Sequence, residues 1–172
     1  MRRIQVVPQK WTVHFVRTEH RNRNCASLRS LDIPASTTEV YGTFSGCTNL
    51  TSLFFHGNAP SIVVSPFLYD TNLTVYYLPG KTGWTSTLGG RPAVLWNPQA
   101  QSADGSFGIQ NNGFGFNITA STNIPFVVEA NNVLAGTNWT PLQNCAVTNG
   151  SIYFSDPYWT NFPVRFYRIR SP

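Results

Sequence analysis

Side chains that could carry acid–base chemistry are few in this sequence and lie far apart. Three histidines and seven carboxylates are spread over 172 residues. His56 is the best placed histidine, because it directly follows a short apolar stretch and could meet Asp32 or Asp70 in space. A histidine held by a carboxylate is the arrangement that a general base needs. We therefore keep one enzymatic hypothesis, a small hydrolase of unfamiliar type in which these three residues act on an ester, a lactone or a glycoside.

Motifs of the common enzyme and metal sites are absent. The sequence contains no G-x-S-x-G, H-E-x-x-H or P-loop pattern, and Gly113-Phe-Gly115 lacks the third glycine of a dinucleotide-binding turn. The three cysteines, Cys25, Cys47 and Cys145, form no C-x-x-C pair. We therefore expect no metal and no cofactor, assign no catalytic residue outside the hydrolase alternative, and favour a non-enzymatic module.

Aromatic residues next to polar ones suggest ligand binding instead. The candidate binding residues are aromatic or polar side chains of two segments: Asp156, Tyr158, Trp159, Asn161, Tyr77 and Trp84. Aromatic rings could stack on a sugar, while the carboxylate and the amide would bond its hydroxyl groups. The alternative for both segments is structural, with the rings closing the end of a β-domain or covering the end of a core. We predict a polysaccharide or a surface protein as the partner.

The elements that must position these residues begin with an internal repeat. Two segments share the pattern C-x-x-L-x-x-L-x-(apolar), starting at Cys25 and, 22 residues later, at Cys47. Leu31 and Ile33 alternate, as do their counterparts in the second copy, so each copy predicts a short strand with one buried face. A period of 20–29 residues with this leucine spacing is typical of leucine-rich repeats. The two cysteines could form a disulfide between neighbouring coils, or remain reduced in the core, which we favour.

This repeat resembles the BspA-like class of bacterial leucine-rich repeats. The landmarks are Ile33-Pro34 after the first strand, Thr43-Phe44 before the second cysteine, and the run Cys47–Leu53. Thr43 departs from the usual alanine, and the stretch before Phe44 is about one residue short. A Tyr-Tyr-Leu-Pro-Gly run, a Gly-Trp and a Gly-Gly-Arg-Pro within residues 76–92 resemble the end of such arrays. The resemblance implies a short solenoid with a C-terminal cap on a secreted or cell-surface bacterial protein.

The second half of the sequence changes to short alternating segments broken by turns, which predicts a small antiparallel β-sandwich. Its landmarks Trp139–Leu142, Phe154–Pro157 and Arg165–Arg170 resemble an accessory module that follows such repeats in environmental bacteria. The predicted fold is therefore mainly β. The predicted divisions are a basic segment with an irregular cap (1–24), repeats and cap (25–96), a polar linker (97–104) and the sandwich (105–172).

Charge and hydropathy limit the partners further. Seven of the twelve Lys and Arg residues lie in residues 1–30, so nucleic-acid binding could rest on that segment alone, and we do not expect it. No apolar run approaches the roughly 20 residues of a membrane span. No secretory signal is visible in this chain either, because none of its apolar runs reaches the required 7–15 residues or so. The oligomeric state stays open.

Overall fold

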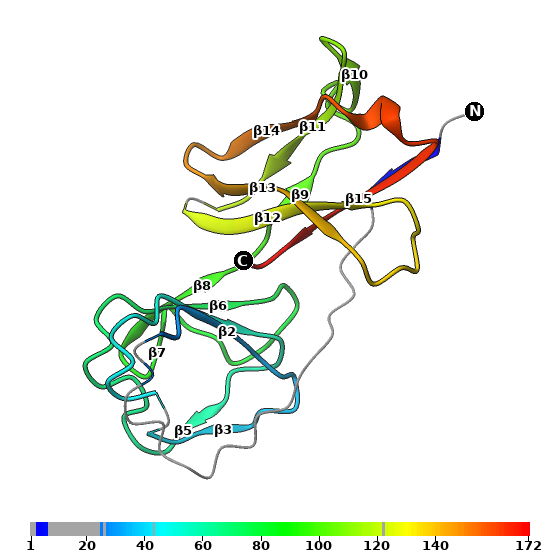
Figure 1. The fold of residues 1–172 in the computed structure, drawn as a ribbon. Coiled ribbons are helices and arrows are strands. Elements are labelled where there is room, and N and C mark those ends of the chain that lie inside the picture. The colour runs from blue at the N-terminus through cyan, green and yellow to red at the C-terminus, as the bar shows by residue number, and fades with distance from the viewer. Residues whose placement is uncertain (1–2, 7–24, 26, 43, 122) are drawn as a thin grey trace. The chain divides into compact units, whose positions relative to one another are not determined.

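The protein is built mainly of β-strands. The computed structural model describes residues 3–6, 25, 27–42, 44–121 and 123–172, the first of these ranges by backbone alone. Within these ranges the regular elements are strands β1–β15 and one 3₁₀ turn, η1 (Trp159–Asn161). No helix in the described part of the chain is long and apolar enough to cross a membrane. The chain forms two compact units, which are described separately: residues 3–6 and 97–172 belong to one, and the described residues from 25 to 96 to the other (Figure 1).

The first unit, here called the parallel-sheet unit, contains the described residues from 25 to 96. One sheet has the strand order β2 (Ser30–Ile33), β4 (Ser52–Phe55), β6 (Thr74–Tyr77), β8 (Arg91–Leu95) and β7 (Thr87–Leu88). A second, two-stranded sheet pairs β3 (Glu39–Val40) with β5 (Ser61–Ile62). Strands β2, β4, β6 and β8 are parallel. Ser30 pairs with Ser52, and Ser52 with Thr74, so the partners in β2, β4 and β6 lie 22 residues apart in sequence, whereas Val75 of β6 pairs with Ala93 of β8 at an offset of 18. Glu39 and Ser61 keep the same offset.

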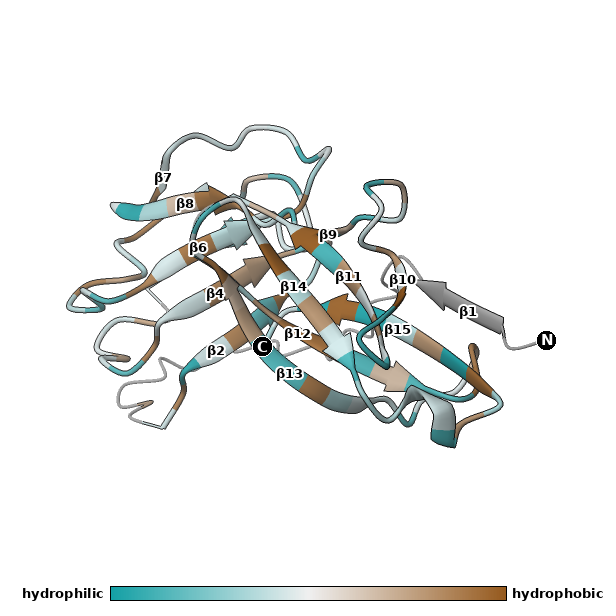
Figure 2. Cartoon of the chain, turned by 90° about the horizontal axis from the view of Figure 1, so that it is seen from above, coloured by the Kyte–Doolittle hydropathy of each residue, from teal (hydrophilic) through white to brown (hydrophobic). Residues whose placement is uncertain are grey.

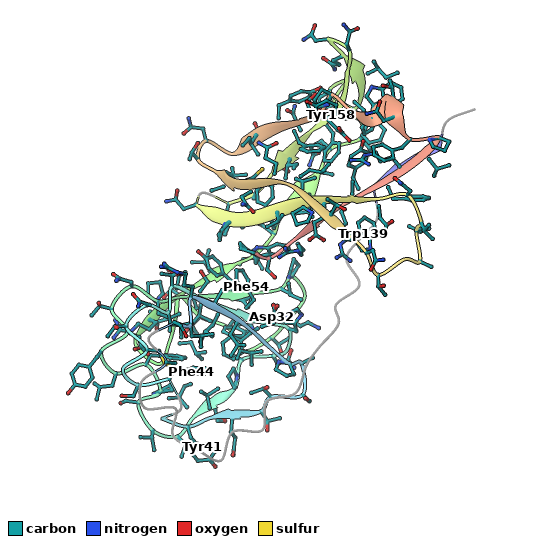
Figure 3. All side chains as sticks on the ribbon, viewed as in Figure 1. Asp32, Tyr41, Phe44, Phe54, Trp139 and Tyr158 are labelled. Carbon is teal, nitrogen blue, oxygen red and sulfur yellow. A yellow bond between two sulfur atoms is a disulfide. The ribbon has the colours of Figure 1, made fainter. Side chains whose placement is uncertain are left out.

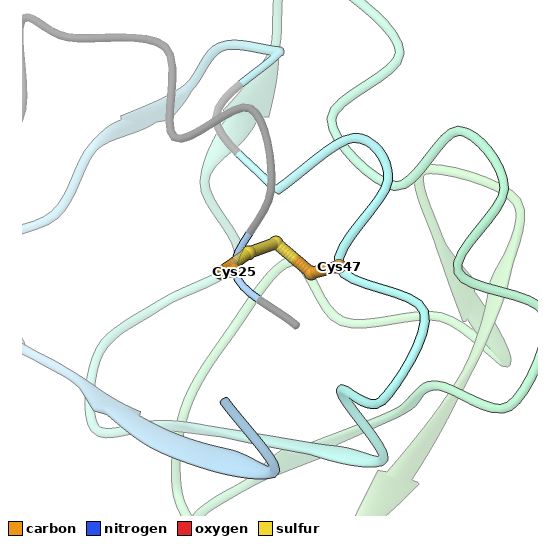
Figure 4. Close-up of a disulfide and its surroundings, with 2 residues drawn as sticks. All are labelled: Cys25 and Cys47. Atoms are coloured by element: carbon orange, nitrogen blue, oxygen red, sulfur yellow. A yellow bond between two sulfur atoms is a disulfide. The ribbon is translucent and has the colours of Figure 1, made fainter. Parts of the chain in front are cut away.

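Alternation along these strands fills the core of the unit. Ile33, Leu53, Phe55 and Val75 point to the inner side and are buried there, together with Leu50 and Phe67 from the turns. Cys25 and Cys47 are joined in a disulfide, with their Cα atoms 4.9 Å apart (Figure 4). The expectation of two reduced thiols is therefore wrong. Equivalent positions of successive copies meet in space, because the strands they precede are parallel and in register.

The second unit, here called the antiparallel unit, contains two four-stranded sheets. One has the order β1 (Arg3–Val6), β15 (Val164–Arg170), β12 (Ile124–Asn131) and β13 (Thr140–Val147); the other has β10 (Gly108–Gln110), β11 (Gly113–Thr119) and β14 (Ser151–Asp156), with β9 (Gln99–Ala100) also on β11. Hydrophobic and hydrophilic residues alternate along β11 and β15 (Figure 2). Inward aromatic rings of the two sheets pack together, as Phe114 and Tyr167 do at 5.3 Å.

Two local pairings were not expected from the sequence. Residues 3–6, assigned to a cap of the repeats, form β1 and pair in parallel with β15 of the antiparallel unit. Gln99 and Ala100, assigned to the polar linker, form β9 and pair with Thr119 and Ile118. The hydrophobic pattern of so short a segment does not identify its pairing partner, so these two pairings come from the structure alone. The rest of the predicted cap, residues 7–24, lies outside the described residues.

Candidate functional site

The structure brings together two residues of the hydrolase hypothesis. Asp32 of β2 is paired with Phe54 of β4, and His56 follows two residues later, so both side chains emerge on the outward face of the parallel sheet. His56 Nε2 lies 2.9 Å from Asp32 Oδ1, at hydrogen-bonding distance. The His56 side chain is 7% exposed and that of Asp32 is 49% exposed. An imidazole oriented by a carboxylate is thus present at the end of β4.

Asp70, the third residue of that hypothesis, lies in different surroundings. It is fully buried, near the backbone amides of Cys47 and Gly46 and the guanidinium of Arg91. Burial raises the pKa of the Asp70 carboxyl, and these amides and Arg91 act in the opposite direction. Arg91 Nη2 donates to the carbonyl of Phe67 at 3.0 Å, which ties it to the same turn. Asp70 therefore belongs to the core side of the unit, whereas Asp32 and His56 lie on the outward face.

The raised pKa of Asp70 predicts a pH dependence of stability. The pKa of Asp70 in the folded protein is above its unfolded value of about 3.9. Protonated Asp70 therefore stabilises the fold fully below about pH 3.9, and this stabilisation is lost as pH rises through the folded pKa. We expect Asp70→Asn to unfold at higher urea concentration than the parent near neutral pH. The difference should shrink as pH falls toward about 3.9. Urea titrations followed by amide resonances of β4 and β6 would test this, and a variant that is less stable at every pH would contradict it.

Polar side chains line the outward face at the amino-terminal end of the strands. Ser30, Ser52 and Thr74 pair across β2, β4 and β6, and all three are half-buried. We call them the hydroxyl row. Asp32 lies in the next row of the same face, which gives the row an exposed neighbouring carboxylate. Together they offer hydrogen-bond donors and acceptors that converge on one strip, which suits a ligand with many hydroxyl groups.

Aromatic rings lie beside Asp32 and His56 on the same face. The ring of Phe54 stacks on that of Tyr76, with the centroids 4.9 Å apart, and makes an edge contact with Trp96, with the centroids 6.4 Å apart. All three residues are buried. Because the three rings pack against one another, they hold β4, β6 and β8 in place beside the hydroxyl row.

Tyr77 and Trp84, predicted to stack on a ligand, stack on each other. Their ring centroids are 4.7 Å apart with the planes at 3°. Trp84 also meets the edge of Phe55 at 5.3 Å, and its Nε1 donates to the carbonyl of Gly57 at 3.2 Å. Both side chains are packed against the core of the parallel-sheet unit. Each ring thus covers one face of the other.

Asp156, the polar residue of the predicted binding loop, is buried. Its Oδ2 accepts hydrogen bonds from Arg165 Nε at 2.7 Å and from the Tyr167 hydroxyl at 3.0 Å. Its Oδ1 accepts from the backbone N–H of Tyr158 at 2.9 Å. Burial, together with the charge of Asp156, raises the pKa of the Tyr167 hydroxyl. The carboxylate is therefore directed into the unit, where it joins β14 to β15.

The other loop residues divide between core and surface. Trp159 is buried in η1, with its ring 6.4 Å from that of Phe114. Tyr158 is 69% exposed, and Asn161 is exposed too (Figure 3). Of the four loop residues singled out from the sequence, these two present their side chains to solvent. The loop thus offers one ring and one amide.

Sequence reasoning missed the arginine partners of the buried acids. Glu129 of β12 is held by Arg168 and Arg170 of β15, and the Arg168 guanidinium lies 4.4 Å above the ring of Trp139. The spacing of two residues between the arginines was the available signal, since it places both on one face of a strand. No three side chains of metal-binding type gather anywhere among the described residues.

Comparisons of the chain with protein-family models, with curated proteins and with solved structures found no match.

Proposed function

We propose that the chain is a non-enzymatic binding module of a secreted or cell-surface protein, and that it recognises polysaccharide. In this proposal residues 25–96 form a short BspA-like leucine-rich-repeat solenoid with its C-terminal cap, and residues 105–172 form an appended β-sandwich. The 22-residue offset between parallel strands supports the first part, because a stacked repeat must pair its copies at the repeat period. The Cys25–Cys47 disulfide is compatible with an extracellular protein.

The hydroxyl row carries the proposal. Neutral donors and acceptors from Ser30, Ser52 and Thr74 lie side by side on three strands of one rigid sheet. Such a row can exchange its water contacts for the hydroxyls of successive sugars without leaving a buried charge unpaired. The composition agrees with this view, since charged residues make up only 11% of the chain. The hydroxyl row therefore fits an extended, uncharged polymer better than a charged partner.

The test is depletion of the chain from solution by insoluble neutral polysaccharides such as cellulose, xylan and chitin. We expect at least one of them to retain the parent chain. The double variant Ser30→Ala, Ser52→Ala should bind about tenfold more weakly, because two hydrogen bonds are lost. Ser61→Ala is the matched control, since Ser61 is an exposed serine of the other sheet of the same unit. Retention by a surface protein alone would replace polysaccharide as the ligand, and retention by neither would refute the proposal.

The Asp32–His56 hydrogen bond favours one second candidate, a hydrolase for an ester, a lactone or a glycoside. A screen of the purified chain against chromogenic substrates of these three classes separates the two functions. We expect no turnover above that of a heat-denatured sample. Turnover that disappears in both His56→Ala and Asp32→Asn would establish the hydrolase instead, since a general base and its orienting carboxylate act as a unit. Turnover that survives both changes would place catalysis elsewhere.

A further inference from the structure

Strand β11 has an unusual outward face. Phe114, Phe116 and Ile118 point inward and are buried, so the alternate positions point outward. Two of these outward positions are glycines, Gly113 and Gly115. Glycine weakens the interior of a strand, and it often marks a place where another group must approach the backbone closely.

Tyr153 of β14 is the group that approaches Gly115. Pairing of β11 with β14 sets Asn117 opposite Tyr153 and Gly115 opposite Ser155, so the tyrosine ring leans across the diagonal. A Cβ atom at Gly115 would lie 2.5 Å from Cζ of Tyr153 and would also collide with its hydroxyl. The outer end of the ring therefore lies against the strand only because residue 115 is glycine. Tyr153 is nevertheless 41% exposed.

The neighbouring glycine repeats the arrangement. The hydroxyl of Ser155 occupies the space that a Cβ at Gly113 would need. Ser155 is exposed, and its hydroxyl lies beside the Tyr153 ring on the same outward face of β14. We call Gly113, Gly115, Tyr153 and Ser155 the glycine-floored platform. It presents one aromatic ring and one hydroxyl over two glycines.

Polar side chains next to the platform are held in fixed orientations. Asn117 Nδ2 donates to Asp104 Oδ2 at 2.9 Å, and Gln101 Nε2 donates to Thr119 Oγ1 at 2.7 Å. The hydroxyl of Ser106 donates to Asp104 Oδ1 at 2.6 Å. A side-chain amide has two donor hydrogens and an acceptor oxygen, so these bonds use only part of the hydrogen-bonding capacity of Asn117. The rim is thus preorganised, and Asp104 is the charged group among these residues.

We infer that the glycine-floored platform is a second glycan site of the chain, separate from the hydroxyl row and specific for a neutral, β-linked chain of pyranose sugars. Such a chain is extended, and the C–H faces of its sugars would pack against the exposed part of the Tyr153 ring. Its equatorial hydroxyls would reach Ser155 on one side and Asn117 on the other. The class of ligand, a glycan, is taken from the proposed function. The location of the site is argued from the contact between Tyr153 and Gly115.

The charge of Asp104 and the hydrogen bonds that it already accepts disfavour ionic ligands at the platform. An anionic ligand would meet Asp104 as the charged group of the rim, and a cation would find one carboxylate that already accepts bonds from Ser106 and Asn117. Tyr158 offers the contrasting case in the same unit, an exposed tyrosine on a loop rather than across a glycine floor. Because the Tyr153 side chain is held against Gly115, it has less conformational freedom to lose on binding.

The experiment is an NMR titration of the full chain with soluble cellohexaose and xylohexaose, with α-linked maltohexaose for comparison. We expect the amide signals of Gly113, Gly115 and Asn117 to shift with a β-linked probe and not with maltohexaose. Tyr153→Ala should weaken this binding about tenfold, while Tyr153→Phe, which keeps the ring, should stay within about threefold of the parent. Tyr158→Ala is the matched control and should bind as the parent does. Thermal melting and the amide spectrum confirm that each variant is folded.

The outcomes separate this inference from the proposed function. If the hydroxyl-row variant loses binding while Tyr153→Ala does not, the polysaccharide function stands and the second site is refuted. Equal loss in Tyr158→Ala would move the site to the loop and overturn the platform. If the parent chain binds none of the soluble or insoluble glycans, the proposed function fails and the platform fails with it. Shifts at residues 113–117 that need about tenfold more glycan in Tyr153→Ala, and not in Tyr153→Phe or Tyr158→Ala, are the result that establishes the site.

Discussion

Replacing Asp156 with alanine is expected to lower the free energy of unfolding of the antiparallel unit by about 3–5 kcal/mol. The carboxylate is buried and accepts hydrogen bonds from Arg165, Tyr167 and the backbone of Tyr158. Its removal would leave the Arg165 guanidinium, which is also buried, without its counter-charge. Asp156→Asn keeps the shape and should still lose much of the same stability, since the charge is what balances the arginine.

Urea titration followed by the amide resonances of β11 and β15 measures this loss in the antiparallel unit itself. Asp104→Ala is the control, because Asp104 is an exposed carboxylate of the same unit whose hydrogen bonds can be replaced by water. It should cost about 1 kcal/mol or less. Equal losses in the two variants would show that Asp156 does not have the structural role assigned to it. If Asp156→Ala folded normally and its glycan binding changed, Asp156 would instead be a ligand contact.

Opening the Cys25–Cys47 disulfide should destabilise the parallel-sheet unit by about 3 kcal/mol, the size expected for a loop of this length. The two cysteines are 22 residues apart and join the first described copy of the repeat to the second. Loss of the bond leaves the first copy attached through β2 and its neighbouring turns. The unfolding midpoint of β2 and β4 resonances in urea should therefore fall on reduction.

The double variant Cys25→Ala, Cys47→Ala provides the control, because a reducing agent should not change its midpoint. Thiol titration of the denatured, unreduced chain should find one free cysteine, Cys145, and three after reduction. Three free thiols before reduction, in a chain purified from an oxidising compartment, would contradict the disulfide and remove one support for an extracellular location.

The strands of the repeat were predictable because their information is local. The apolar pairs at Leu31–Ile33 and Leu53–Phe55 alternate with the period of a strand, and they lie in β2 and β4 as expected. Their 22-residue spacing reappears as the pairing of Leu31 with Leu53. The mainly β character of the second half followed in the same way, from short alternating segments between turns.

Contacts between distant strands could not be derived in this way. Nothing near Arg165 marks Asp156 as its partner, because the pairing depends on how β14 and β15 pack in space. The glycines at 113 and 115 were visible as a strand pair, but only the register of β11 against β14 brings the Tyr153 ring over Gly115. The same limit applies to Asp32 and His56, which were two of three candidates, and to Asp70, which the fold places on the core side of the unit.

Equilibrium depletion of the intact chain by an insoluble neutral polysaccharide, measured at low and at high salt, tests the central claim most directly. Binding through hydroxyls, amides and an aromatic ring should be saturable and nearly independent of salt, in contrast with binding to a polyanion, which falls steeply as salt rises. The proposal predicts saturable retention that changes by less than about twofold between roughly 50 and 500 mM salt. Absence of retention, or retention that disappears at the higher salt, would contradict a neutral-glycan binding module.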